Sequence, residues 1–199
     1  MSAHQKETEL LVRELLGDGY VTFKAAGLAF EENFENERVK VRCEVLNGGG
    51  AKHPISGEGV GLIDAFFTGL KARLSETYPS LKTIVFADFS VKADVATKKG
   101  LAGSDSSALI QLVVENGQNR RFAFTHSSRS ITRSSLEVTL QACSYFVNSE
   151  LAFVKTRQAL EHAKKEKRSD SVERYTMILT QLVENTSYGD VIPKLSSAP

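Results

Sequence analysis

The stretch that decides the fold runs from Gly57 to Ala65 and reads GEGVGLIDA. Its three glycines stand directly before a helical pattern, in which apolar residues recur at three- and four-residue spacing up to Leu74. This pattern predicts a tight glycine-rich connection that leads into a helix. Alternating or β-branched residues precede it at positions 20–30 and 38–46, and a shorter extended stretch follows them. The sequence therefore predicts strands followed by a helix.

A second stretch, which reads HSSRSITRS, runs from His126 to Ser134 and aligns with the first at a constant offset of 69 residues (126 − 57). Serine takes the place of glycine at the tight positions, and Ile131 corresponds to Leu62. The segments before the second stretch follow the same plan. Strands are predicted at 84–95, 108–115 and 120–125, and a helical pattern continues from about 131 toward 160. The repeat predicts two similar halves.

The predicted fold class is α+β, with two pseudo-symmetric strand-strand-strand-helix units. The units cover positions 20–79 and 82–152, and together they form one domain. We expect an N-terminal helix within 1–19, a C-terminal helical extension within 153–187 and a frayed tail at 188–199. A slip in apolar parity between Phe86 and Phe89 predicts a β-bulge near Asp88, and a polar loop is predicted at 97–107.

The composition limits the classes of partner. The chain has 199 residues, of which 41% are hydrophobic and 25% charged, and its formal net charge is +1. This balance gives no chain-wide attraction for nucleic acid or an anionic membrane. Cys43 and Cys143 have no CxxC or Cys/His cluster nearby, so we expect buried, reduced thiols, no metal and no cofactor. No signal peptide and no apolar run of roughly 20 residues is found, so a soluble cytoplasmic protein is expected.

The connections before the two helices form the candidate binding site. Backbone N–H groups at the start of a helix are unpaired and lie at the positive end of its dipole, which suits a carboxylate or a phosphate. Glycines let a ligand approach the backbone, serines add hydroxyls, and Asp64 can cap N–H groups or hold an ammonium. The same residues also fit tight turns that serve only the fold. The P-loop and dinucleotide-binding patterns are not matched.

These motifs, together with the strand ALIQLVVE at positions 108–115, resemble the C-terminal regulatory domain of α-isopropylmalate synthase and the related domain of citramalate synthases. The similarity extends from about Tyr20 to Leu151. The resemblance implies two strand-strand-strand-helix units, a homodimer, and binding of leucine or isoleucine for feedback inhibition of amino-acid biosynthesis. The effector-binding residues that it implies are Gly57, Gly59, Val60, Gly61, Leu62, Asp64, Ala65, Ser127, Ser128, Ser130 and Ile131.

The sequence departs from that family at three positions. The family usually has proline where Leu62 stands, glycine where His126 stands and an acidic residue where Arg133 stands. These departures bear on which effector is bound and on whether the second turn binds one. The family's catalytic barrel typically needs about 250 residues and is absent here, so we expect no catalysis by this chain. A separate synthase catalytic subunit is a candidate partner.

Three other functions are alternatives to amino-acid sensing. A ligand-free dimerisation module would need only an exposed sheet face or a long helix. A nucleic-acid-binding module is suggested by basic clusters at 120–121 and 164–168, but no aromatic residues interleave with them, so no nucleic-acid partner is expected. For an enzyme, His126 beside Ser127 and Ser128 could act as base and nucleophile, but we expect instead a histidine that caps or packs.

Overall fold

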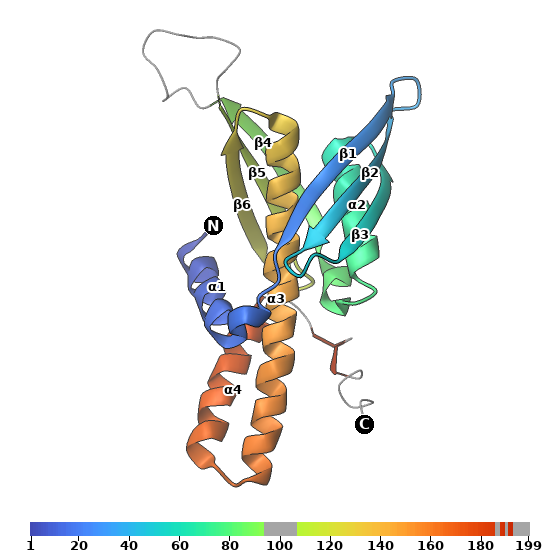
Figure 1. Cartoon of the computed structure of the whole chain (residues 1–199). Helices are drawn as coiled ribbons and strands as arrows, with labels where there is room; N and C mark the ends of the chain where they lie inside the picture. The colour runs from blue at the N-terminus through green and yellow to red at the C-terminus, as the bar shows by residue number, and fades with distance from the viewer. Residues whose placement is uncertain (94–106, 186–187, 190, 193–199) are drawn as a thin grey trace.

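The structure is a computed structural model that describes residues 1–93, 107–185, 188–189 and 191–192. It contains two three-stranded antiparallel sheets, each followed by a helix, with further helices toward both ends (Figure 1). This arrangement confirms the predicted α+β class with two units. The polar loop predicted at 97–107 lies, up to residue 106, outside the described residues, as does most of the predicted tail.

The first unit consists of β1 (Phe23–Asn33), β2 (Arg38–Asn47), β3 (Lys52–Gly59) and α2 (Leu62–Leu74). Strand β2 lies in the middle of its sheet, antiparallel to both neighbours. Its alternate residues Val39, Val41 and Val45 are buried, as the alternation predicts, and α2 packs against β2 and β3. Strand β3 is longer than expected, because it continues through the first two glycines of the deciding stretch.

The second unit consists of β4 (Val85–Ala93), β5 (Ala108–Glu115), β6 (Arg121–Ser128) and α3 (Ile131–Lys165). It repeats the first unit at the predicted offset. Helices α2 and α3 begin 69 residues apart (131 − 62), and β3 and β6 begin at the same offset (121 − 52). The pairing is preserved as well, since Val39 lies opposite Gly59 and Ala108 lies opposite Ser128.

The irregular features of the two sheets also correspond. The predicted bulge lies in β4 between Phe86 and Asp88, and β1 has a bulge between Ala25 and Gly27, opposite the equivalent pair of residues in the middle strand. The side chain of Asn47 accepts hydrogen bonds from the next N–H groups of its turn, those of residues 49 and 51, and Asn116 does the same with residues 118 and 120. The repeat therefore extends to turn chemistry.

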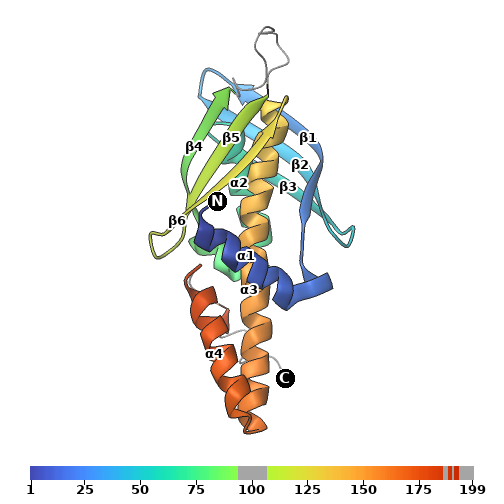
Figure 2. The ribbon, with the colours of Figure 1, turned by 90° about the vertical axis from the view of Figure 1, so that its left-hand side faces the viewer.

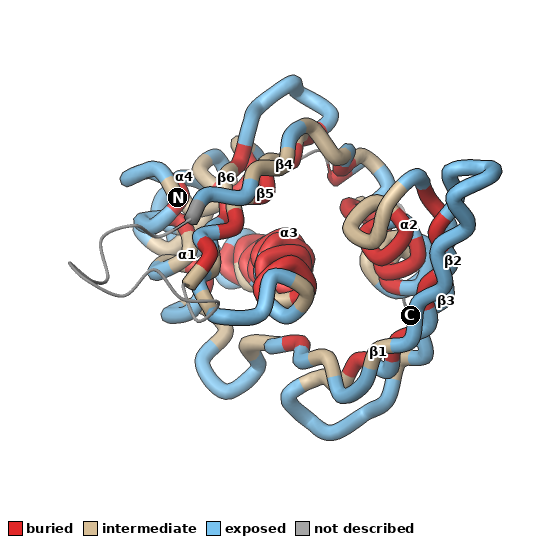
Figure 3. Tube along the Cα trace, turned by 90° about the horizontal axis from the view of Figure 1, so that it is seen from above, coloured by how far each residue is buried: buried red, intermediate tan, exposed pale blue. Residues whose placement is uncertain are grey.

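Helices α2 and α3 lie between the two sheets and carry the most buried segments of the fold (Figure 3). One hydrophobic cluster joins both units, to which α3 contributes residues from Leu136 to Val147. Helix α3 has 35 residues and continues unbroken past position 152 into the predicted extension. There α1 (Ala3–Leu16) and α4 (Ser169–Val183) pack against it in a second cluster (Figure 2). Short 3₁₀ helices, η1 (Gly17–Gly19) and η2 (Pro79–Thr83), complete the fold.

Candidate functional site

The two predicted turns lie at the same end of the molecule, because β3 and β6 both end there and α2 and α3 both start there (Figure 1). Each turn exposes one large apolar side chain. Val60 is 72% exposed and Ile131 is 52% exposed. The structure therefore brings the two turns to one end of the fold and leaves an apolar side chain of each open to solvent.

The glycines Gly57 and Gly59 lie within β3 and allow α2 to approach this strand closely. A Cβ atom on Gly57 would stand 2.0 Å from the carbonyl oxygen of Ala65, and one on Gly59 would stand 2.6 Å from the backbone nitrogen of Ala65. Gly69 meets the strand from the helix side, since a Cβ atom there would stand 2.6 Å from the carbonyl oxygen of Ser56. These glycines therefore serve the packing of backbone on backbone.

The start of α2 has no side-chain cap. Gly61 occupies the capping position with an extended backbone and offers no side chain to the first N–H groups of the helix. Asp64 turns back toward the strand, where its Oδ2 accepts a hydrogen bond of 3.0 Å from the backbone N–H of Val60. Leu62 is half-buried. A carboxylate, an apolar surface and uncapped helical N–H groups therefore lie together here.

The start of α3 is closed by its own serines. The hydroxyl of Ser130 accepts a hydrogen bond of 3.2 Å from the backbone N–H of Arg133, which is an N-cap. The hydroxyl of Ser128 donates to the carbonyl oxygen of Ser130 and accepts from its N–H. Ser127 is exposed at the end of β6. At the second turn, a side chain thus caps the backbone N–H groups at the start of the helix. At the first turn, the corresponding N–H groups of α2 have no side-chain partner.

His126 lies against Ser134, on the first turn of α3. Its Nδ1 is 3.1 Å from the Ser134 hydroxyl oxygen, which is also 2.7 Å from the hydroxyl oxygen of Ser128. Ser134 is fully buried. Within the described residues, the His126 side chain makes its hydrogen bond with Ser134 and none with Ser127 or Ser128, the two serines considered as nucleophiles.

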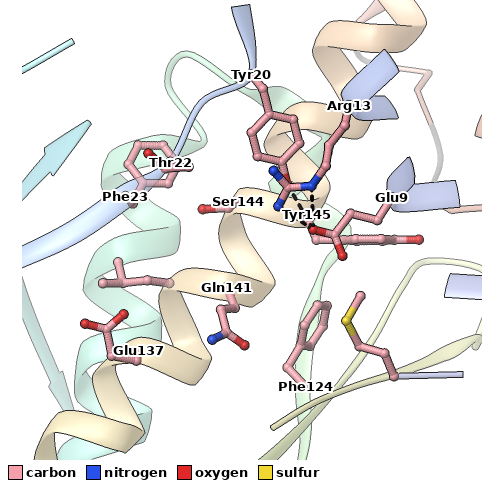
Figure 4. A pocket seen from close by; sticks show the side chains of 12 residues that line it. Glu9, Arg13, Tyr20, Thr22, Phe23, Phe124, Glu137, Gln141, Ser144 and Tyr145 are labelled. Atoms are coloured by element: carbon pink, nitrogen blue, oxygen red, sulfur yellow. Dashed lines mark hydrogen bonds and ion pairs between the residues drawn. The ribbon is translucent and has the colours of Figure 1, made fainter. Parts of the chain in front are cut away.

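A pocket that the sequence did not reveal lies between α1, the segment before β1 and α3 (Figure 4). Its volume is about 320 Å³. One wall is a polar stripe along α3, formed by Glu137, Gln141 and Ser144, and Asn148 continues the stripe. The spacing of 4, 3 and 4 residues places all four on one face of the helix. That spacing of polar residues along the helix was the signal available in the sequence.

The two thiols of the core favour their neutral forms. Burial raises the pKa of the Cys143 thiol to about 12, and a nearby Lys71 opposes this only in part. Burial and Glu44 raise the pKa of Cys43 to about 11. Both thiols are free and buried, as predicted, and both are protonated at neutral pH. Within the described residues, no group of three His, Cys, Asp or Glu side chains is placed to hold a metal ion.

No protein-family model matches the chain. The likeness to the regulatory domain of α-isopropylmalate synthase therefore stays a prediction from the two turn motifs. In the part of the chain that the structure describes, no helix combines the length and the apolar character needed to cross a bilayer.

Proposed function

We propose that the chain is an amino-acid-sensing regulatory and dimerisation domain, like the one that ends α-isopropylmalate synthase, and that it has no catalytic activity of its own. The observation that carries the proposal is the start of α2. There the helix has no side-chain cap, the Asp64 carboxylate lies in the first turn of the helix, and Val60 is exposed. These are the groups that an amino acid requires: donors for its carboxylate, an acceptor for its ammonium and an apolar contact.

In the proposed complex, the first N–H groups of α2 donate to the effector's carboxylate and the Asp64 carboxylate accepts from its ammonium. The aliphatic side chain lies against Leu62 and Ile131, one from each unit. Discrimination between effectors that differ by one methylene is then limited to about 1 to 3 kcal/mol. A leucine- or isoleucine-like amino acid fits this arrangement. The proposed sensor acts as a cytoplasmic homodimer, with a separate synthase subunit as a candidate partner and without nucleic acid or membrane.

A ligand-free dimerisation module is the second candidate. It is favoured by large apolar side chains that are exposed near the same end of the molecule, on the β1–β2 hairpin as well as at the turns. Phe34 is 84% exposed and Phe30 is 50% exposed. Apolar residues gathered at one end are typical of a surface that another chain covers. Such a surface needs no effector to pair two copies.

Thermal unfolding in the presence of each of the twenty amino acids separates the two candidates. An effector at 100 times its dissociation constant should stabilise the fold by about 2.7 kcal/mol. The matched variants are Asp64→Asn, which keeps an acceptor for the Val60 N–H, and Arg133→Asn at the equivalent position of the second unit. We expect the first to abolish the shift and the second to retain it.

A further variant, Gly61→Ser, supplies α2 with the cap that α3 already has. It should stabilise the unliganded protein by a few tenths of a kcal/mol. It should also weaken binding of the effector, because the serine hydroxyl then competes for the same N–H groups. A protein that is dimeric but shows no shift with any amino acid would contradict the sensor function and leave the dimerisation module.

A further inference from the structure

The pocket between α1, the segment before β1 and α3 is a second candidate binding site, separate from the turns. With about 320 Å³, it falls at the lower end of the range of small-molecule sites, roughly 300 to 1,000 Å³. Its lining combines aromatic rings with polar side chains (Figure 4). The rings belong to Tyr20, Phe23, Phe124 and Tyr145. The site thus has the mixed lining that binds an apolar body and orients a polar group.

The pocket wall already holds one cation on an aromatic ring. The guanidinium of Arg13 lies over the ring of Tyr20 at 4.0 Å, and its Nη2 donates to Oε1 of Glu9 at 2.7 Å. The Tyr20 hydroxyl donates to the same carboxylate oxygen. Burial, with Glu9 beside it, raises the pKa of Tyr20 to about 12, so the ring stays neutral. Arg13 is therefore balanced by Glu9 within the wall.

The carboxylate of Glu137 has no positively charged partner of this kind among the described residues. It lines the pocket from α3 and makes no ion pair or hydrogen bond with any residue that the structure describes. The same holds for the side chains of Gln141 and Ser144, one and two turns farther along the helix. The lining side chains thus include two carboxylates and one guanidinium. The unpaired carboxylate of Glu137 and the hydroxyl of Ser144 are half-buried, and the side chain of Gln141 is exposed.

We propose that this pocket binds a small organic cation, a primary amine that carries an aromatic or aliphatic body. The rings and Leu140 take the apolar body, and the Glu137 carboxylate accepts from the ammonium. Gln141 and Ser144 supply further acceptors for the remaining ammonium protons. A carboxylate ligand is disfavoured, because Arg13 is already engaged by Glu9 and Tyr20.

Three shape-matched probes test the charge of the ligand. Phenethylammonium, phenethyl alcohol and phenylpropionate are titrated into the full chain, and binding is followed by calorimetry and by chemical shifts of the aromatic protons. We expect the amine to bind at least about tenfold more tightly than the alcohol, the ratio that a charged hydrogen bond supplies. Tighter binding of phenylpropionate, or equal binding of amine and alcohol, would overturn the proposal.

Variants locate the site. Glu137→Gln should weaken the amine about tenfold, whereas Glu14→Gln, an exposed residue of α1 outside the pocket, should leave the affinity unchanged. Gln141→Glu adds a second carboxylate to the same face and should tighten amine binding about threefold, which tests the site even if Glu137→Gln folds poorly. Unchanged affinity in both pocket variants would contradict the assignment. Asp64→Asn should leave amine binding intact. A negative result for the pocket can therefore be distinguished from a negative result for the turn site.

Discussion

The β3–α2 and β6–α3 junctions have the same backbone plan and opposite chemistry. In the first, Gly57 and Gly59 face Ala65 with no side chain between strand and helix. In the second, the equivalent strand positions carry His126 and Ser128, and the equivalent helix position carries Ser134, whose hydroxyl contacts both. In the first junction, strand and helix pack closely because the glycines have no side chains. In the second, hydrogen bonds between side chains connect the strand to the helix.

This difference teaches that a repeat can keep its geometry while its two copies take on different roles. The serine-rich junction satisfies the start of α3 internally, through the Ser130 cap. The glycine-rich junction brings α2 close to β3 and leaves the start of α2 uncapped. In the proposed complex, the effector therefore uses the free N–H donors at the start of α2, and its contacts are asymmetric between units that are otherwise alike.

The largest loss of stability is expected when a side chain is placed in the glycine-rich junction. Gly57→Ala sets a Cβ atom 2.0 Å from the carbonyl oxygen of Ala65, so α2 must move away from β3. We expect a loss of roughly 3 kcal/mol in the free energy of unfolding, because the clash is with backbone atoms and only a shift of the whole helix relieves it. Urea unfolding followed by circular dichroism measures it.

The control for this change is Gly61→Ala in the same motif. An added Cβ atom at Gly61 meets nothing within 4 Å, and the backbone there is extended. Its cost should stay below about 1 kcal/mol, the difference between glycine and alanine at a capping position. Equal losses in Gly57→Ala and Gly61→Ala would refute the packing role of the glycines.

The next effect compares the one thiol that each unit buries. In the unfolded chain, both thiols ionise near pH 9.0, whereas in the fold the pKa is about 11 for Cys43 and about 12 for Cys143. Each raised pKa gives stability that is fully present below pH 9 and is lost as the pH rises toward the folded value. By pH 10 each thiol should cost about 1.4 kcal/mol relative to pH 7.

This pH dependence is measured by chemical unfolding between pH 7 and pH 10, where buried tyrosines with a raised pKa, such as Tyr20, add a decline of their own. Cys143→Ala and Cys43→Ala should each remove about 1.4 kcal/mol of the decline at pH 10, whatever their effect at pH 7. A decline that neither variant alters would show that other groups cause it.

The smallest of the three effects concerns the hydrogen-bonded junction. Ser134→Ala gives α3 the residue that α2 already has and removes the partner of both His126 and Ser128. The half-buried groups left behind, His126 and Ser128, should cost about 1 kcal/mol. Ser127→Ala, an exposed serine of the same strand, should change stability by less than about 0.5 kcal/mol. If thermal unfolding gives the same result for both, the network does not stabilise the junction.

Much of the fold could be predicted, because the alternation in β2 and the 69-residue repeat are local patterns in the sequence. The bulge near Asp88 was also visible as a slip in parity. The ends of β3 and β6 were placed too early. Glycine and serine are typical of turns, but here alternate positions, such as Gly57 and Gly59, face a helix, and that neighbour is set by tertiary packing.

The candidate turns were found from their small residues, but the pocket beside α3 was not. Its walls come from α1, the start of β1 with the segment before it, β6 and α3, so residues as far apart as Glu9 and Ser144 line one pocket only in the folded chain. Neither the capped start of α3 nor the uncapped start of α2 follows from composition, since serine and glycine both occur at capping positions. Which side chain reaches which N–H group depends on rotamers that the sequence pattern does not specify.

The side chain of Asn148 offers a way to watch the two units separate. It accepts from the N–H of Val21 at 2.7 Å and donates to the carbonyl oxygen of the same residue at 2.7 Å, which ties the segment before β1 to α3. Val21 lies outside the strand ladder. Its amide proton is therefore protected from hydrogen exchange by the opposite unit alone, and its exchange rate reports how often the first unit parts from the helix of the second.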